Sequence, residues 1–131
     1  METIQIITKR KDEFVDITKD VSKILNQAGI DSGICIIYCT HTTAGLTINE
    51  NADPSVKKDI INYLNKAIPE GEGYSHIEGN SDSHIKASIF GSSLNVIVEG
   101  GRLVLGTWQG IYFCEFDGPR SREVCVKIIK G

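Results

Sequence analysis

The chain has 131 residues, 40% of them hydrophobic, which is enough to bury one sizeable core and predicts a single domain over residues 1–131. Its formal charge of −3 and pI near 5.6 give no indication of a basic surface. We therefore expect neither nucleic acid nor an anionic membrane as the main partner. No stretch approaches the roughly 18 apolar residues of a membrane span, and the N-terminal residues form no signal-peptide core, so we expect a cytoplasmic protein.

The first half of the chain alternates between strand and helix patterns. Residues 3–8 and 14–18 alternate with a period of two and predict a hairpin closed by the charged loop 9–13. Residues 18–28 predict a helix that Thr18 caps and Gly29 ends, with an apolar stripe facing the core. Residues 33–40 and 44–50 predict two strands, and the nearly continuous apolarity of the first indicates that both of its faces are covered.

The second half begins with two helix patterns and ends in strands. Asp53 as the N-cap and Pro54 at the first position predict a helix over 54–68. Its buried side is expected to carry Val56, Ile60, either Tyr63 or Leu64, and Ala67. After a flexible connection at 69–75, a shorter helix is predicted from about residue 81 to Gly91. Strands are then predicted at 93–99, 101–105, 110–116 and 122–129, in the pattern of an antiparallel meander.

The four cysteines all lie within β-branched or aromatic runs: Cys35, Cys39, Cys114 and Cys125. Cysteine in such a setting usually packs as a small apolar residue, and a reducing cytosol would keep all four as thiols. We therefore assign them packing roles and no chemistry.

The three histidines are the first candidates for a site. His41 follows a predicted strand, whereas His76 and His84 lie on either side of a predicted loop-to-helix transition. Taken singly, each is most simply a hydrogen-bonded or exposed side chain. Taken together, three neutral imidazoles can fill three positions of a tetrahedral metal and leave the fourth for water or substrate. The spacing alone does not show that they converge.

Other polar residues have a similar double interpretation. Glu50 follows an apolar strand and is a candidate to orient an imidazole or act as a general base, or it simply faces solvent. Asn80 is either a helix cap or a ligand contact, and Trp108 either packs the core or lines a pocket. Arg120 and Lys86 are the cations whose context best suits contact with a phosphate.

Three long motifs resemble one known family. The stretches HTTAGLTINENADPSVKKD, EGNSDSHIKASIFGSS and GGRLVLGTWQGIYFCEFDGPRSREV are similar to the YjbQ family, also called uncharacterised protein family 0047. The resemblance covers nearly the whole chain. It implies an α+β fold, mostly antiparallel and sandwich-like with two to three helices, that assembles as a homotrimer with polar pockets near the subunit contacts.

The resemblance also implies site residues and an activity, since the designation secondary thiamine-phosphate synthase is in use for the family. The family's histidine positions correspond to His41, His76 and His84, and its acidic and amide positions to Glu50, Asp53 and Asn80. The activity is a weak transferase reaction that joins hydroxymethylpyrimidine diphosphate to thiazole phosphate and releases pyrophosphate. Magnesium would then neutralise much of the departing charge.

Two hypotheses follow from these observations. In the transferase hypothesis, the catalytic candidates are His41, Glu50 and His84, and the substrate-binding candidates are Thr42, Thr43, Asn80, Lys86, Trp108 and Arg120. No phosphate-binding glycine motif supports it. In the alternative, the chain is a metal-binding trimer of hydrolytic or small-metabolite-binding function, with His41, His76 and His84 as ligands of zinc or another transition metal.

Overall fold

The computed structural model describes residues 1–71 and 73–131. In that part of the chain, the strands form a five-stranded sheet of order β1-β8-β3-β5-β6 and a three-stranded sheet of order β2-β7-β4. Every paired strand is antiparallel to its neighbour. In chain order the elements are β1 (Glu2–Ile7), β2 (Glu13–Asp16), α1 (Thr18–Ala28), β3 (Gly33–Cys39), β4 (Ala44–Glu50), α2 (Pro54–Ala67), α3 (Ser81–Phe90), β5 (Ser93–Glu99), β6 (Arg102–Leu103), β7 (Gln109–Glu115) and β8 (Ser121–Lys130).

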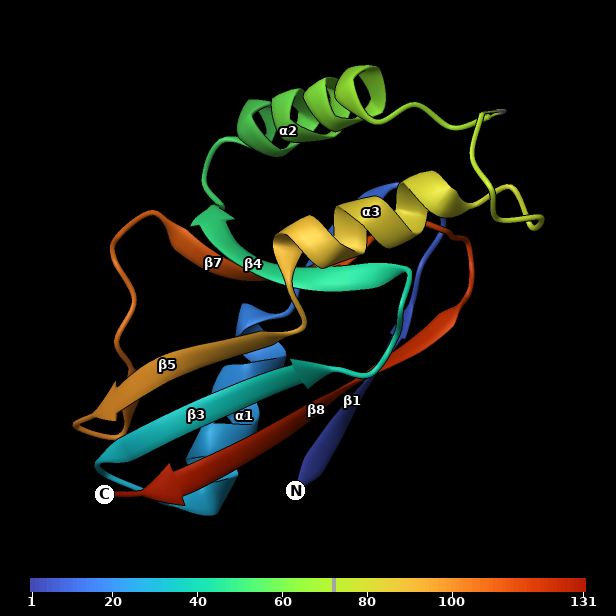
Figure 1. The fold of residues 1–131 in the computed structure, drawn as a ribbon. Helices are drawn as coiled ribbons and strands as arrows, with labels where there is room; N and C mark the ends of the chain where they lie inside the picture. The colour runs from blue at the N-terminus through green and yellow to red at the C-terminus, as the bar shows by residue number, and fades with distance from the viewer. Residues whose placement is uncertain (72) are drawn as a thin grey trace.

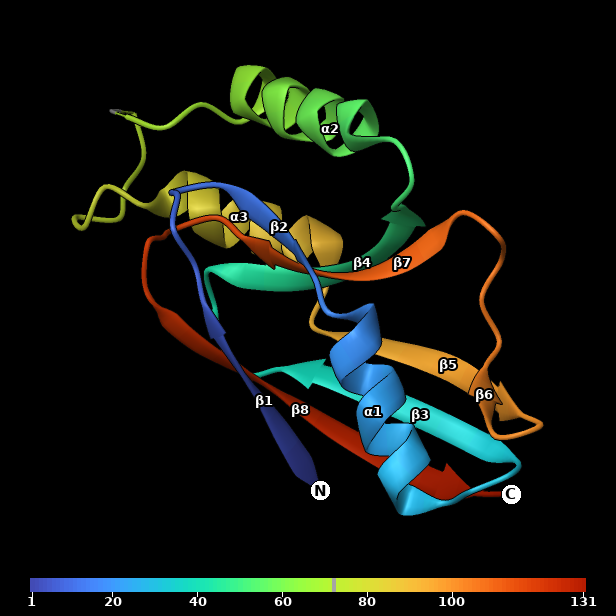
Figure 2. The same ribbon diagram turned by 180° about the vertical axis from the view of Figure 1, so that it is seen from behind.

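The elements stack in layers, as Figures 1 and 2 show from opposite sides. The larger core lies between the two sheets and includes the apolar side of α1. A smaller core lies on the other face of the three-stranded sheet, where Phe14, Tyr112 and Phe116 pack under α2 and α3. The predicted α+β domain with sandwiched sheets is confirmed. Among residues 1–71 and 73–131, no helix or strand lies over the outer face of the five-stranded sheet (Figure 1).

Helix α1 begins one residue earlier than a Thr18 cap would require. Thr18 is the first helical residue, and its N–H and hydroxyl both donate to Asp16 Oδ1, at 2.9 and 2.6 Å. Gly29 ends the helix in a left-handed conformation with φ of 66°, as predicted, because only glycine adopts that angle without strain. Val21 and Leu25 are buried against the sheets.

Helix α2 begins as predicted but packs more loosely. Asp53 Oδ1 accepts hydrogen bonds from the backbone N–H of Ser55 at 2.9 Å and from its hydroxyl at 2.7 Å, which confirms the N-cap. The expected buried stripe is wrong, because no residue of α2 is buried. Ile60 and Leu64 are only partly covered by the smaller core.

The predicted pairing of strands is wrong at both ends of the chain. β1 pairs with β8 and β2 pairs with β7, so the expected first hairpin does not form and its two strands enter different sheets. Of the expected C-terminal meander only the β5–β6 hairpin forms, because β7 lies between β2 and β4 and β8 between β1 and β3. Residues 8–12 and 116–120 are therefore crossings from one sheet to the other.

Strand β3 alternates between a buried and an exposed face. Cys35, Ile37 and Cys39 are buried, whereas the side chains of Ile34 and Tyr38 are 47% and 46% exposed. The expectation that both faces of this strand are covered is therefore not met within one chain. Strand β7 is instead the strand that is covered on both faces, since its residues 110–115 are all buried between the two cores.

The four cysteines are free thiols, as expected. Cys35, Cys39 and Cys114 are buried and Cys125 is half-buried. Cys114 and Cys125 lie in different sheets, so they do not face each other across a hairpin. Burial raises the pKa of the Cys35 thiol to about 11, which leaves it unreactive at neutral pH.

None of the helices in the described residues has the length and apolarity needed to cross a bilayer.

Candidate functional site

A polar cavity lies where three distant segments meet. The segments are the turn 40–43 between β3 and β4, the stretch 76–84 leading into α3, and the β7–β8 crossing with the start of β8. The cavity has a volume of about 390 Å³ and is lined almost entirely by polar side chains. A second hollow of about 520 Å³ adjoins it, because His41, Thr42 and His84 line both.

Close contact between α3 and β4 positions one wall of this cavity. Gly45 lies directly under the end of α3, where an added Cβ would be 2.9 Å from the carbonyl oxygen of Gly91. That same oxygen accepts a hydrogen bond from Leu46 N–H at 3.1 Å, which ties the helix end to the strand. Glycine at this position therefore lets α3 lie against the strand that follows the His41 turn.

The structure brings all three predicted histidines to one cavity. The rings of His76 and His84 meet edge to face, with centroids 5.3 Å apart. His41 approaches from the β3–β4 turn, and its Nε2 accepts a hydrogen bond from the backbone N–H of Glu123 at 3.0 Å. Convergence on a common cavity, which spacing alone did not establish, follows from the fold.

These histidines do not fit a three-histidine metal centre within one chain. Across residues 1–71 and 73–131, no three His, Cys, Asp or Glu side chains form a set that could hold a metal ion. The Nε2 lone pair of His41 is already used by Glu123 N–H. His76 and His84 are the other two imidazoles of the cavity, and their rings contact each other.

The electrostatic setting of His41 favours its neutral form. Burial lowers the pKa of His41, and the positive charge of Arg122 lowers it further, against smaller opposing effects of the Glu115 and Glu123 carboxylates. The ring also lies edge-on to Phe113, with centroids 6.4 Å apart. His41 therefore enters the cavity as an uncharged, fixed side chain.

A buried ion pair forms the base of the cavity, and sequence reasoning missed it. Arg122 is 4% exposed and donates through Nε to Glu115 Oε1 at 2.8 Å and through Nη2 to Glu115 Oε2. Arg122 Nη2 also donates to the Thr43 hydroxyl at 2.8 Å, which holds the 40–43 turn against β8. Thr8 donates its hydroxyl proton to Glu115 Oε1 at 2.8 Å.

The hydrogen bonds to Glu115 decide its ionisation. Burial by itself would raise the pKa of Glu115, but hydrogen bonds from Arg122, Asp117 N–H and Thr8 outweigh burial and hold the pKa below its usual range. The available signal was a charged residue in register with the apolar positions of each strand: Glu115 in YFCEF and Arg122 in SREVCV.

Arg120 lines the cavity as predicted, and Asp117 orients it. The Arg120 guanidinium donates to the Asp117 carboxylate at 3.0 Å and to its backbone oxygen at 2.9 Å, while its side chain remains 51% exposed. Asn80 donates to the same carboxylate at 2.9 Å. Its own Oδ1 is buried and accepts no hydrogen bond from a described residue.

Lys86, predicted to contact substrate, lies elsewhere. It is a fully buried residue of α3, and its ammonium contacts Asn65 at 2.7 Å, Asp12 at 3.2 Å and Asp82 at 3.4 Å. Lys11 also donates to Asp82, at 2.7 Å. Lys86 therefore ties α2, α3 and the β1–β2 segment together and does not face the cavity, which corrects the prediction.

Glu50 and Trp108 also lie apart from the cavity. Glu50 is the last residue of β4. At about 3.3 Å per strand residue, it lies roughly 20 Å from the His41 turn, which precedes the strand. Its carboxylate accepts a hydrogen bond from Ala52 N–H at 2.9 Å. Trp108 is 62% exposed in the β6–β7 connection. Within one chain, neither lines the cavity that contains the histidines, which corrects the expectation that they join this site. Thr42, Thr43 and Asn80, the other predicted contacts, do line the cavity.

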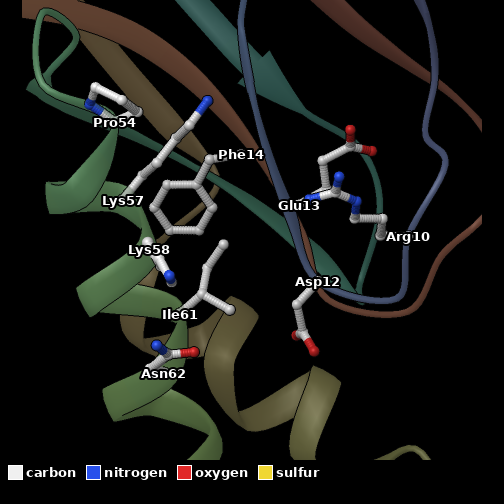
Figure 3. A pocket seen from close by; sticks show the side chains of 9 residues that line it. All are labelled: Arg10, Asp12, Glu13, Phe14, Pro54, Lys57, Lys58, Ile61 and Asn62. Carbon is white, nitrogen blue, oxygen red and sulfur yellow. The ribbon is translucent and has the colours of Figure 1, made fainter.

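A third hollow, of about 520 Å³, separates α2 from the β1–β2 segment (Figure 3). Phe14 and Ile61 form its apolar part, and Lys57 and Lys58 project from α2 beside them. Asp12 on its other side is already paired with Lys86. This hollow contains none of the histidines and none of the other residues that line the polar cavity.

Comparisons with known proteins all match this chain to one family. The model of the family described as UPF0047 protein YjbQ-like matches residues 2–131. The UPF0047 protein YugU of Bacillus subtilis is 55% identical, covering 98% of both chains, and a UPF0047 protein of Methanocaldococcus jannaschii is 55% identical over 95% of this chain and 91% of its own.

Two solved structures have nearly the same fold. A YjbQ/UPF0047-family protein of Clostridium acetobutylicum matches with a TM-score of 0.97 and 53% identity over 98% of this chain and 100% of that chain. A YbjQ-like protein of unknown function from Sulfolobus solfataricus matches with a TM-score of 0.95 and 34% identity over 99% of this chain and 96% of that chain. The likeness extends over the whole domain.

Proposed function

The chain belongs to the UPF0047 (YjbQ-like) family, and from that premise we propose that it binds a small phosphorylated metabolite in the polar cavity and acts on it as a transferase. The observation that carries the proposal is the convergence of His41, His84 and Arg120 from three distant segments on one cavity of about 390 Å³. A cavity of this size, with few apolar walls and several convergent donors, suits a small anionic substrate.

The specific reaction we propose is thiamine-phosphate synthesis of the kind implied by the family resemblance. The bond between the pyrimidine methylene carbon and the diphosphate oxygen breaks, the thiazole nitrogen forms the new C–N bond, and pyrophosphate leaves. Charge accumulates on the departing oxygens, so donors fixed beside them stabilise the transition state. Arg120, Thr42 and His84 line the cavity and are our candidates for those donors.

The charged side chains of the cavity determine what neutralises a bound diphosphate. Arg120 is paired with Asp117, and Arg122 is paired with Glu115, so neither cation is uncompensated. Magnesium bound with the diphosphate would supply the missing positive charge. About half of the Arg120 side chain is exposed, so its guanidinium can donate hydrogen bonds to the substrate. Asp117 holds the guanidinium in the orientation for those bonds.

Replacing Arg120 by alanine is expected to reduce product formation on the order of tenfold to a hundredfold, the cost of one or two charge-assisted hydrogen bonds. The measurement is thiamine phosphate formed by purified protein with both substrates and magnesium. His84→Ala is expected to lower the rate as well. Arg102→Ala, at an exposed arginine of β6 outside the cavity, is the matched control and should keep the rate. Equal rates in all four proteins would contradict the proposal.

A second candidate function is metal binding by the His76–His84 pair, with hydrolysis or metabolite binding as the outcome. The two rings, 5.3 Å apart and edge to face, favour it. Zinc suits imidazole ligands, and nickel, copper and iron are compatible with them. The Nε2 lone pair of His41 already accepts the Glu123 N–H and cannot also bind the metal. Further metal ligands would therefore come from water, substrate or another copy of the chain.

Metal analysis of protein purified without a histidine tag tests this candidate. Bound transition metal close to one ion per site is expected to fall on His76→Ala or His84→Ala, and to fall further at low pH, where protons compete for the imidazoles. His41→Gln is the control and should retain the metal. Metal content that is negligible in the unaltered protein would eliminate this candidate and leave the transferase proposal.

We also propose that the protein assembles as a homotrimer through the bare face of the five-stranded sheet. Ile97, Ile34 and Ile129 lie side by side across β5, β3 and β8, because Ile34 pairs with both neighbours. Their exposed fractions are 62%, 47% and 47%. A row of apolar side chains of this kind marks a surface that another copy covers.

A further inference from the structure

One hydrogen bond restricts what His41 can do in the cavity. A neutral imidazole has one N–H and one nitrogen lone pair. Its Nε2 accepts the backbone N–H of Glu123 at 3.0 Å, so the lone pair is already used at that nitrogen. The proton must then be on Nδ1, which makes no hydrogen bond to any described residue.

The surroundings hold the ring in this arrangement. Glu123 belongs to β8, where it pairs with Gln5 of β1, so the N–H that fixes Nε2 cannot turn away without breaking the sheet. Phe113 packs edge-on to the ring at 6.4 Å between centroids. Burial and the nearby charge of Arg122 lower the pKa of His41 and oppose protonation of the ring.

We infer that His41 contacts the bound molecule as a neutral hydrogen-bond donor through Nδ1, and that the atom it contacts is an anionic oxygen. Neither ring nitrogen is then available as a metal ligand or as a base. The identification of that oxygen with a phosphate rests on the proposed function, whereas the Nδ1–H tautomer follows from the hydrogen bond alone.

The hydrogen bonds of the ring nitrogens distinguish His41 from the other two histidines. Among the residues that the structure describes, no hydrogen bond involves the ring nitrogens of His76 or His84, whose rings contact each other at 5.3 Å. Their lone pairs therefore remain available. We assign to this pair the chemistry that needs a free ring nitrogen, which is metal binding or proton donation to the substrate, and to His41 a contact with an anionic oxygen that uses only Nδ1–H.

Nitrogen-15 NMR of the ligand-free protein tests the tautomer directly. Long-range coupling spectra distinguish a protonated Nδ1 from a protonated Nε2 in each histidine. At pH 7 we expect His41 to show a protonated Nδ1 and an unprotonated Nε2. A protonated Nε2, or an imidazolium at pH 7, would overturn the inference, and the experiment needs neither substrate nor turnover.

Two probes then separate the roles of the histidines. Inorganic pyrophosphate with magnesium should shift the Nδ1–H resonance of His41, because that proton enters a hydrogen bond with an anionic oxygen. Zinc alone should change the ring-nitrogen resonances of His76 and His84 and leave those of His41 in place. A zinc-induced shift of a His41 ring nitrogen to a metal-bound position would overturn the inference.

Two substitutions supply matched controls, because the amide of asparagine lies near the position of Nδ1 and that of glutamine near the position of Nε2. His41→Asn retains a donor toward the cavity, whereas His41→Gln retains only an acceptor for Glu123. We expect pyrophosphate affinity to fall about tenfold or more in His41→Gln and by less than about threefold in His41→Asn. The reverse order would overturn the inference. If the tautomer is as inferred and no thiamine phosphate forms, only the proposed reaction fails.

Discussion

Replacing Glu115 by alanine is expected to lower the free energy of unfolding by about 3 to 5 kcal/mol, because it leaves a buried guanidinium without its counter-charge. Arg122 is 4% exposed, and Glu115 accepts hydrogen bonds from both its Nε and its Nη2. Urea unfolding followed by circular dichroism measures the change. Glu2→Ala, at an exposed position of β1, is the control and should change stability by less than about 0.5 kcal/mol.

A double replacement separates loss of charge pairing from loss of packing. Glu115→Leu with Arg122→Met removes both charges and keeps apolar volume, so it should recover much of the stability that Glu115→Ala loses. Equal losses in Glu115→Ala and Glu2→Ala would show that the pair contributes nothing. The 40–43 turn should loosen in the double variant, because the Thr43 hydroxyl loses the donor that holds it.

The ion pair also gives stability a definite pH dependence. The pKa of Glu115 is lower in the folded chain than in the unfolded chain, where a glutamate has a pKa of about 4.3. Its contribution is therefore fully present above about pH 4.3 and is lost as the pH falls through the lower, folded value. Glu115→Ala should lack this part of the acid dependence.

Replacing Ile34 by aspartate is expected to convert the proposed trimer to single chains. Each Ile34 lies between Ile97 and Ile129 on the bare sheet face, so a carboxylate there would be buried without a partner in any assembly that covers this face. Light scattering gives the mass, and circular dichroism should show that the fold is kept, since Ile34 is 47% exposed in one chain.

Ile89→Asp is the matched control for this experiment. Ile89 is 64% exposed on α3, on the helical side of the molecule. The Ile89→Asp substitution should leave the mass measured by light scattering unchanged. Dissociation by Ile89→Asp alone would place the interface on the helices, and a single-chain mass for the unaltered protein would contradict the trimer itself.

Local patterns predicted the elements well, because each depends on residues close in sequence. Gly29 ends α1 through its own backbone angle, and Asp53 caps α2 through Ser55, two residues away. Pairing of strands depends on distant residues, and a period of two in β1 says only that one face is buried. It could not show that β1 would join β8 in place of β2.

The candidate site was predictable in composition but not in arrangement. His41, His84 and Arg120 were selected by residue type and context, and the fold brings them together. Glu50 and Lys86 were selected on the same grounds, but one bonds Ala52 and the other is buried among Asp12, Asn65 and Asp82. A residue type shows which chemistry is possible, whereas burial and hydrogen-bond partners show whether that chemistry is still available.

The hydrogen bond between Glu123 and His41 also has a consequence during synthesis of the chain. It joins residues 82 positions apart, and its donor lies in the last strand. A nascent chain that has passed residue 90 already contains all three histidines and α3, yet His41 has no partner for Nε2 until β8 leaves the ribosome. The cavity is therefore completed only when synthesis is nearly finished, and truncated chains that lack β8 cannot contain it.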